Sequence, residues 1–193
     1  MRLAIRVFFI LRLMEDKKWR TIRKNYLHRT PWFAFRLDEV SLPDGAGIEY
    51  GVLEANDVSA TLAITNEGNI VLVRQWRQPL GGMSLSIPGG AVEAEEAAEA
   101  AAERELFEET GYRAEGMKRI ASVHTTPGRS DEMCHVFECR AAPDEIGPRP
   151  DSTEFIEVVE MGFEEAMEEV RGGGITDAVT VLALTAFSKG GCR

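Results

Sequence analysis

Three glutamates, Glu105, Glu108 and Glu109, fall close together in a stretch that runs from Glu96 to Thr110. This stretch is rich in Ala, Glu and Leu and has no Gly or Pro, which predicts a helix, and Gly111 follows where that helix would end. At spacings of three and four residues the carboxylates share one helix face and repel one another. Two interpretations stay open: a solvated acidic face, or a site for a hard cation such as Mg²⁺ or Mn²⁺, which prefers oxygen ligands.

The residues around the glutamates have a fixed spacing. Gly90 is followed after five residues by Glu96, and after seven more by Arg104 and the run Glu-Leu-Phe-Glu-Glu-Thr-Gly-Tyr, which ends at Tyr112. This pattern resembles the Nudix box at each of its fixed positions. The resemblance implies a Nudix hydrolase, which uses a divalent metal to hydrolyse a nucleoside diphosphate linked to another group.

The resemblance also implies a role for each box residue. The metal ligands would be the side chains of Glu105, Glu108 and Glu109 and the main-chain carbonyl of Gly89, with Mg²⁺ as the expected cofactor and Mn²⁺ as its alternative. Glu108 would in addition be a candidate catalytic base. The remaining positions would be structural, with Arg104 pairing with Glu96; they are Gly90, Glu96, Arg104 and Gly111.

Features outside the box resemble the ADP-ribose and ADP-sugar pyrophosphatase branch of that family. Pro127 lies sixteen residues after Gly111, and the sequence Arg-Gln-Trp-Arg ends at Arg77, as in that branch. Two positions depart from it, because Ser86 stands where the branch usually has Glu and Gly89 stands where Ala is common.

Five residues outside the box are candidates for the substrate site. The planar guanidinium of Arg77 suits a diphosphate, although a plain surface arginine is the alternative. Trp32 would stack on adenine or lie in a hairpin core, and Tyr50 is a weaker candidate for the other side of the base. Pro127 belongs to the substrate loop or to an ordinary turn. Glu154 would contact metal or activate water, or would be a solvent-exposed residue.

The bulk composition excludes some classes of partner. The chain has 193 residues and a net charge of −10, which disfavours general binding to nucleic acid or acidic membranes. Its three cysteines form an odd number without metal-ligand spacing, which predicts reduced thiols and a cytoplasmic protein.

The N-terminal segment, residues 1–30, is predicted to be a basic extension. Its first thirteen residues are apolar but contain Arg6 and Arg12, and they are too short to span a bilayer. They lack a clear cleavage site, so a signal peptide is not expected. We expect a dispensable extension, with Met14 as a candidate start, or an amphipathic surface segment. Residues 17–27 are predicted to be a short basic helix or irregular.

The rest of the chain alternates between strand and helix patterns. Residues 31–56 are predicted to form a hairpin arm, and residues 57–193 to form the Nudix domain. Strands are expected over residues 32–40, 47–54, 58–65, 70–76, 84–87, 117–125, 133–139 and 155–161, an exposed loop over 142–152, and helices over 96–110, 163–170 and 175–188. Mixed strands with helices on two faces indicate an α/β/α sandwich, the fold that the resemblance implies.

The expected activity is hydrolysis of the pyrophosphate bond of a nucleoside diphosphate sugar, with ADP-ribose giving AMP and ribose 5-phosphate. The resemblance also implies a homodimer that exchanges its N-terminal arms. Alternatives are another nucleotide sugar such as GDP-mannose, a dinucleoside polyphosphate, or a non-catalytic module that binds a nucleotide as a sensor.

Overall fold

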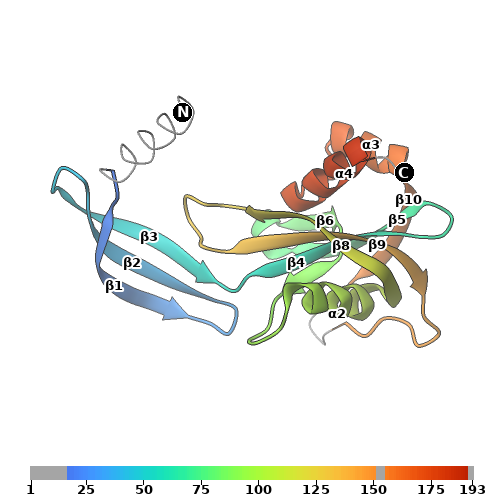
Figure 1. Ribbon diagram of the computed structural model, residues 1–193, viewed down its shortest axis with the longest axis horizontal. Helices are drawn as coiled ribbons and strands as arrows, with labels where there is room; N and C mark the ends of the chain where they lie inside the picture. Colours follow the sequence, from blue (N-terminus) through green and yellow to red (C-terminus); the bar gives the residue numbers. More distant parts are fainter. Residues whose placement is uncertain (1–16, 151–154, 191–193) are drawn as a thin grey trace, which may run out of the picture. The chain divides into compact units, whose positions relative to one another are not determined.

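The structure is a computed structural model that describes residues 17–150 and 155–190. It divides into two compact units (Figure 1). The N-terminal unit contains the described residues up to Ala55, together with the distant loop Thr126–Asp131. The second unit contains residues 56–125 and the described residues from Glu132 onward.

The N-terminal unit is a three-stranded antiparallel sheet in the order β1-β2-β3. The hairpin predicted from the sequence is confirmed as β2 and β3. The prediction of a short helix or an irregular segment over residues 17–27 is wrong, because most of these residues belong to a strand. Almost every residue of this strand is exposed, and it pairs only with β2, so main-chain hydrogen bonds rather than buried side chains place it in the sheet. The strands are β1 (Arg20–Arg29), β2 (Phe33–Ser41) and β3 (Gly47–Ala55).

The loop Thr126–Asp131 is bound to strand β3 along its length. The amide of Leu53 donates a hydrogen bond to the carbonyl of Arg129 (2.7 Å), and the amide of Ala55 donates one to the Asp131 carboxylate (3.2 Å). Leu53 also forms an isolated parallel bridge with Ser130. The loop that follows β8 is therefore an integral part of the N-terminal unit.

The second unit is built on a seven-stranded mixed sheet. Its main order is β10-β5-β4-β9-β8, in which β4 and β9 run parallel and the other neighbours run antiparallel. The strands are β4 (Val58–Ile64), β5 (Asn69–Arg77), β6 (Gly82–Ser86), β7 (Gly89–Ala91), β8 (Tyr112–His124), β9 (Met133–Pro143) and β10 (Glu157–Gly162). A short 3₁₀ turn, η1 (Gln78–Leu80), joins β5 to β6.

Helices cover both faces of this sheet, with α2 on one side and α3 and α4 on the other (Figure 1). Leu106 of α2 packs with Ala63 and Val71, whereas Leu184 of α4 packs in a separate cluster with Leu62 and other sheet residues. The helices are α2 (Ala98–Thr110), α3 (Phe163–Gly172) and α4 (Ala178–Gly190). The predicted α/β/α sandwich is confirmed.

Strands β4 and β5 separate soon after their hairpin. They pair only at Ala63 with Val71 and at Ile64 with Ile70. Beyond that point β6 pairs with β5, and β7 pairs with β4. The short connection between β6 and β7 therefore crosses the split, and it leads directly into the box segment.

Several boundaries differ from those predicted. Helix α2 begins at Ala98, so Glu96 lies in the turn before it. Strand β9 continues to Pro143, into residues predicted to be loop, and α4 begins at Ala178 instead of Ile175. Within the described ranges, every helix is too short or too polar to cross a membrane.

Candidate active site

Helix α2 presents the three box glutamates. Leu106 is fully buried beneath the helix and fixes its orientation on the sheet. Gly111 ends the helix with a left-handed backbone (φ 73°), which glycine adopts without strain. The side chain of Glu109 is almost completely buried, whereas those of Glu105 and Glu108 are half-buried. A buried carboxylate next to two accessible ones requires compensating donors or cations.

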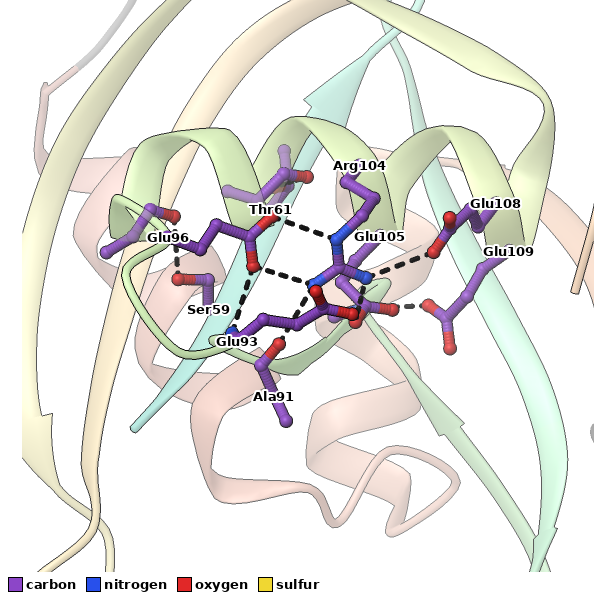
Figure 2. Close-up of polar contacts among 12 residues, drawn as sticks. Ser59, Thr61, Ala91, Glu93, Glu96, Arg104, Glu105, Glu108 and Glu109 are labelled. Atoms are coloured by element: carbon purple, nitrogen blue, oxygen red, sulfur yellow. Dashed lines mark hydrogen bonds and ion pairs between the residues drawn. The ribbon is translucent and has the colours of Figure 1, made fainter. Parts of the chain in front are cut away.

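Arg104 donates hydrogen bonds to the two more accessible box glutamates and to Glu96 (Figure 2). Its Nε and Nη2 atoms donate to both carboxylate oxygens of Glu96, at 2.9 and 3.0 Å, and Nη2 also reaches the Ala91 carbonyl at 3.0 Å. Its Nη1 atom donates to Glu105 at 2.8 Å and to Glu108 at 3.0 Å. One guanidinium therefore holds the turn before the helix and also balances two box carboxylates.

These contacts shift the pKa values of both partners in the direction that favours their charged forms. The hydrogen bond from Arg104 is the main cause that lowers the pKa of Glu96 below its ordinary value of 4.5. The same hydrogen bond, followed by those to Glu105 and Glu108, raises the pKa of Arg104. Glu96 also accepts a hydrogen bond from the amide of Glu93 at 3.0 Å. Both partners are therefore charged at neutral pH, and their pairing orders the turn that leads into α2.

Two glycines of strand β7 lie against the glutamates. The amide of Gly89 donates a hydrogen bond of 2.8 Å to Oε2 of Glu109. A Cβ atom placed on Gly90 would lie 2.4 Å from Oε1 of Glu105, and one on Gly89 would lie 2.3 Å from the carbonyl oxygen of Ser59. Only residues without side chains fit between the sheet and the carboxylates of α2, which explains the two consecutive glycines.

The donor set of this cluster fits a hard divalent cation. It combines three carboxylates, and the main chain of the Gly89–Gly90 segment lies beside Glu105 and Glu109, so all available ligands are oxygen atoms of the kind that Mg²⁺ prefers. Among the described residues, no three His, Cys, Asp or Glu side chains converge at metal-binding distance, and the Arg104 guanidinium contacts two of these carboxylates. The positive charge of Arg104 therefore holds Glu105 and Glu108 close together and balances part of their negative charge.

Arg77 is the last residue of strand β5 and is exposed. Side chains alternate along a strand, and Val71 of β5 packs on the α2 side of the sheet, so Arg77 lies on the face that α2 covers. Strand position therefore directs the Arg77 side chain to the same side of the sheet as helix α2, which carries the box glutamates.

Three other residues predicted to bind substrate, Trp32, Tyr50 and Pro127, belong to the N-terminal unit. Trp32, 72% exposed, lies between β1 and β2 of the N-terminal unit. Tyr50 is half-buried there, where its hydroxyl donates a hydrogen bond of 2.8 Å to the Gly128 carbonyl and its ring meets Trp19 edge-on. Pro127 is exposed in the same loop. Glu154 and Met14 lie outside the described residues.

Two residues near the box were missed by the sequence analysis. Asp177 directly precedes α4 and accepts a hydrogen bond from the amide of Thr180, as an N-cap residue does. The hydroxyl of Thr180 in turn accepts a hydrogen bond from the amide of Ile87, just before the two glycines. An Asp directly before an apolar run, as Asp177 is before Ala178, is a helix-start signal, but no local signal predicts the contact with Ile87.

Two protein-family models match this chain, one over the part that contains the box and one over the N-terminal strands. The family model described as "NUDIX domain" matches residues 55–179. The model described as "Nucleoside diphosphate sugar hydrolase N-terminal domain" matches residues 19–53, which include β1, β2 and all of β3 except its last two residues.

Individual relatives match most of the chain. It is 34% identical over 172 residues to an ADP-ribose pyrophosphatase of Bacillus subtilis, covering 89% of this chain and 93% of that protein. It is 33% identical over 174 residues to a methanol dehydrogenase activator of Bacillus methanolicus, covering 90% and 92%. A crystal structure of an ADP compounds hydrolase has the same fold, with a TM-score of 0.77, 17% identity and coverage of 90% and 94%. The chain therefore belongs to the Nudix hydrolases, as a nucleoside diphosphate sugar pyrophosphatase.

Proposed function

We propose that the protein hydrolyses ADP-ribose to AMP and ribose 5-phosphate and uses Mg²⁺, or alternatively Mn²⁺, to do so. The observation that carries this proposal is the cluster formed by Glu105, Glu108 and Glu109 against the Gly89–Gly90 segment. The choice of ADP-ribose draws on the ADP-ribose pyrophosphatase of Bacillus subtilis, which aligns with nearly the whole chain.

Glu105, Glu108 and Glu109, with the Gly89 carbonyl, would hold the metal. A divalent cation bound there neutralises the charge of the diphosphate and acidifies a bound water molecule. Arg104 would keep its two hydrogen bonds to Glu96 whether or not Glu105 and Glu108 turn to the cation, because these bonds use different nitrogen–hydrogen groups. Helix α2 would therefore stay anchored to the turn before it while the metal ion binds.

Arg77 would bind the diphosphate of the substrate. Its guanidinium offers parallel donors that match two phosphate oxygens, and none of the hydrogen bonds or ion pairs among the described residues engages it. Its position on the α2 face of the sheet supports this role.

The reaction adds water across the bridging P–O bond. The oxygen of water forms a bond to one phosphorus, the bridging oxygen leaves with the other phosphate, and a carboxylate accepts the proton of the water. Glu108, the most exposed of the three box glutamates with 41% of its side chain accessible, is one candidate base. Glu154 is the other.

The base of the substrate would stack on an exposed aromatic ring. Trp32 is largely accessible, and its indole is available for stacking. We further propose that two chains form a homodimer in which the N-terminal sheets are exchanged, so that Trp32, Tyr50 and Pro127 of one chain serve the site of its partner. The free thiols Cys134 and Cys139 are buried, which suits a protein of the reducing cytoplasm.

A product assay tests the substrate directly. The full chain is incubated with Mg²⁺ and, in separate reactions, with ADP-ribose, ADP-glucose, GDP-mannose or a diadenosine polyphosphate, and nucleoside monophosphates are separated by chromatography. We expect the highest kcat/KM for ADP-ribose, with AMP and ribose 5-phosphate formed in equal amounts.

Other outcomes assign other functions. A higher kcat/KM for GDP-mannose, with GMP as product, would replace ADP-ribose as the substrate while keeping the reaction class. Binding of the nucleotides without turnover in the presence of either metal would overturn the enzymatic proposal and would favour a sensor.

A further inference from the structure

The connection between β6 and β7 has two main-chain amides whose hydrogen-bond acceptors are side chains and not strand carbonyls. It crosses the split between β4 and β5, where β6 has ended at Ser86 and β7 begins at Gly89. Ile87 and Pro88 are both buried. A buried amide without a partner is costly, so the amides on either side of Pro88 require acceptors from outside the sheet.

Side chains from two helices satisfy these amides from opposite faces of the sheet. Thr180 of α4 accepts from the amide of Ile87 at 2.9 Å, and Glu109 of α2 accepts from the amide of Gly89 at 2.8 Å. The carbonyl of Pro88 accepts from the amide of Thr61 in β4 at 2.9 Å. Three consecutive residues are thus each fixed by one main-chain hydrogen bond.

Asp177 fixes the orientation of the Thr180 hydroxyl. The hydroxyl donates its only hydrogen to Oδ1 of Asp177 at 2.6 Å, and the same oxygen accepts from the Thr180 amide at 2.8 Å. A lone pair of the hydroxyl is then left for Ile87. Thr180 is fully buried, so no water competes for this bond.

We propose that Thr180, held by Asp177, is a positioning residue for the metal site. By fixing Ile87 from the α4 side, it sets the backbone of Gly89, which in turn contacts the metal-ligand candidate Glu109. The proposal rests on the function proposed above, and it assigns to α4 a part in metal affinity that the box itself does not contain.

The test is the substitution Thr180→Val, which keeps the shape of the side chain and removes the hydroxyl. Thr65→Val is the matched control, because Thr65 is also buried and its hydroxyl also accepts from a main-chain amide, that of Asn69, but at the β4–β5 turn. Thr180→Ser retains the hydroxyl. Mn²⁺ binding to the full-length, metal-free protein is measured by calorimetry, and thermal unfolding is measured in parallel.

We expect Thr180→Val to weaken Mn²⁺ binding roughly 10- to 100-fold, the range typical for residues that orient metal ligands. Thr65→Val is expected to lower the melting temperature comparably and to leave Mn²⁺ affinity unchanged, and Thr180→Ser is expected to bind Mn²⁺ like the native chain. Hydrogen exchange of the peptide that contains Ile87 should accelerate in Thr180→Val alone.

Equal Mn²⁺ affinity in Thr180→Val and Thr65→Val would overturn the positioning role while leaving the proposed function intact. Failure of the native chain to bind Mn²⁺ would overturn both. Should Thr180→Val not fold, Thr180→Ala provides the same comparison, because its smaller side chain places no methyl group against the Ile87 amide.

Discussion

Arg104 and Glu96 form a two-pronged ion pair, with Nε and Nη2 of the arginine 2.9 and 3.0 Å from the two carboxylate oxygens. The glutamate lies in the turn before α2 and the arginine lies within the helix. No side chain caps the helix at Ala97, and the pair instead ties the turn before α2 to a residue within the helix. The remaining nitrogen of the guanidinium, Nη1, donates hydrogen bonds to the box residues Glu105 and Glu108.

This pair should make stability depend on pH in a defined direction. The pKa of Glu96 in the folded protein is below its ordinary value of 4.5, so folding favours the ionised carboxylate and the contribution is present above that pH. Glu96→Gln is expected to cost about 1 kcal/mol at pH 7, the upper end of the range for surface ion pairs, because both side chains of the pair are partly buried. The difference between the two proteins should shrink as the pH falls below 4.5, measured by urea unfolding.

The control for this measurement is Glu99→Gln, which removes a carboxylate from the first turn of α2 that Arg104 does not contact. A difference between the native chain and Glu96→Gln that stays constant from pH 7 to pH 3.5 would contradict the role of the charged pair.

Gly89 and Gly90 should respond differently to an added methyl group. In Gly90→Ala the new Cβ meets the flexible end of Glu105, so the fold should persist while the carboxylate is displaced and Mn²⁺ affinity falls. In Gly89→Ala the new Cβ meets the carbonyl of Ser59 and the Cα of Ala60, which can yield only if β4 moves, and we expect a loss of about 1–3 kcal/mol. Thermal unfolding and Mn²⁺ titration separate the two effects.

Gly47→Ala is a suitable control for both variants, because a Cβ at Gly47 meets no atom within 4 Å. The interpretation fails if Gly90→Ala binds Mn²⁺ as tightly as Gly47→Ala, or if Gly89→Ala is as stable as the native chain.

Tyr112 should titrate at unusually high pH. Burial, together with the hydrogen bond from its hydroxyl to Glu160, raises the pKa of Tyr112 from 10.0 to about 12. The neutral phenol is thus favoured by folding, and its contribution is present below pH 10 and is lost as the pH rises toward 12. Tyr112→Phe is expected to cost about 1–2 kcal/mol at pH 8, a deficit that narrows at higher pH.

The ultraviolet absorbance of tyrosinate checks this value. The difference between the titration curves of the native chain and Tyr112→Phe isolates one phenol, and its midpoint is expected near 12. A midpoint at or below 10 would show that the contact with Glu160 does not persist in solution.

The sequence predicted the parts of the site that depend on short-range spacing. Glu105, Glu108 and Glu109 share a helix face because of the helical repeat alone, and Gly111 ends that helix because of its own backbone preference. The sandwich followed from the alternation of apolar strand patterns with helix patterns along the chain. Two of the expected apolar strands are β4 and β5, and most of their residues are buried.

The features that were missed depend on contacts between distant residues. Strand β1 has no alternation of buried and exposed side chains, so no pattern in its sequence distinguished it from an irregular basic segment. Thr180 and Ile87 are 93 residues apart. The sequence placed Pro127 in a loop or turn without any indication that the loop Thr126–Asp131 pairs with β3. Such hydrogen bonds follow from the arrangement of the strands rather than from local preference.

Glu109→Gln tests most directly whether the box carboxylates bind the divalent cation on which hydrolysis depends. A glutamine in this position can still accept the hydrogen bond from the Gly89 amide, so the fold should remain while the charge is lost. Hydrolysis of ADP-ribose with Mg²⁺ and calorimetric binding of Mn²⁺ are measured on the same preparation. We predict a folded variant whose kcat falls by a factor on the order of 10³, as for loss of an essential electrostatic group, and whose Mn²⁺ binding is strongly weakened. A folded variant with native turnover and native Mn²⁺ affinity would contradict the account.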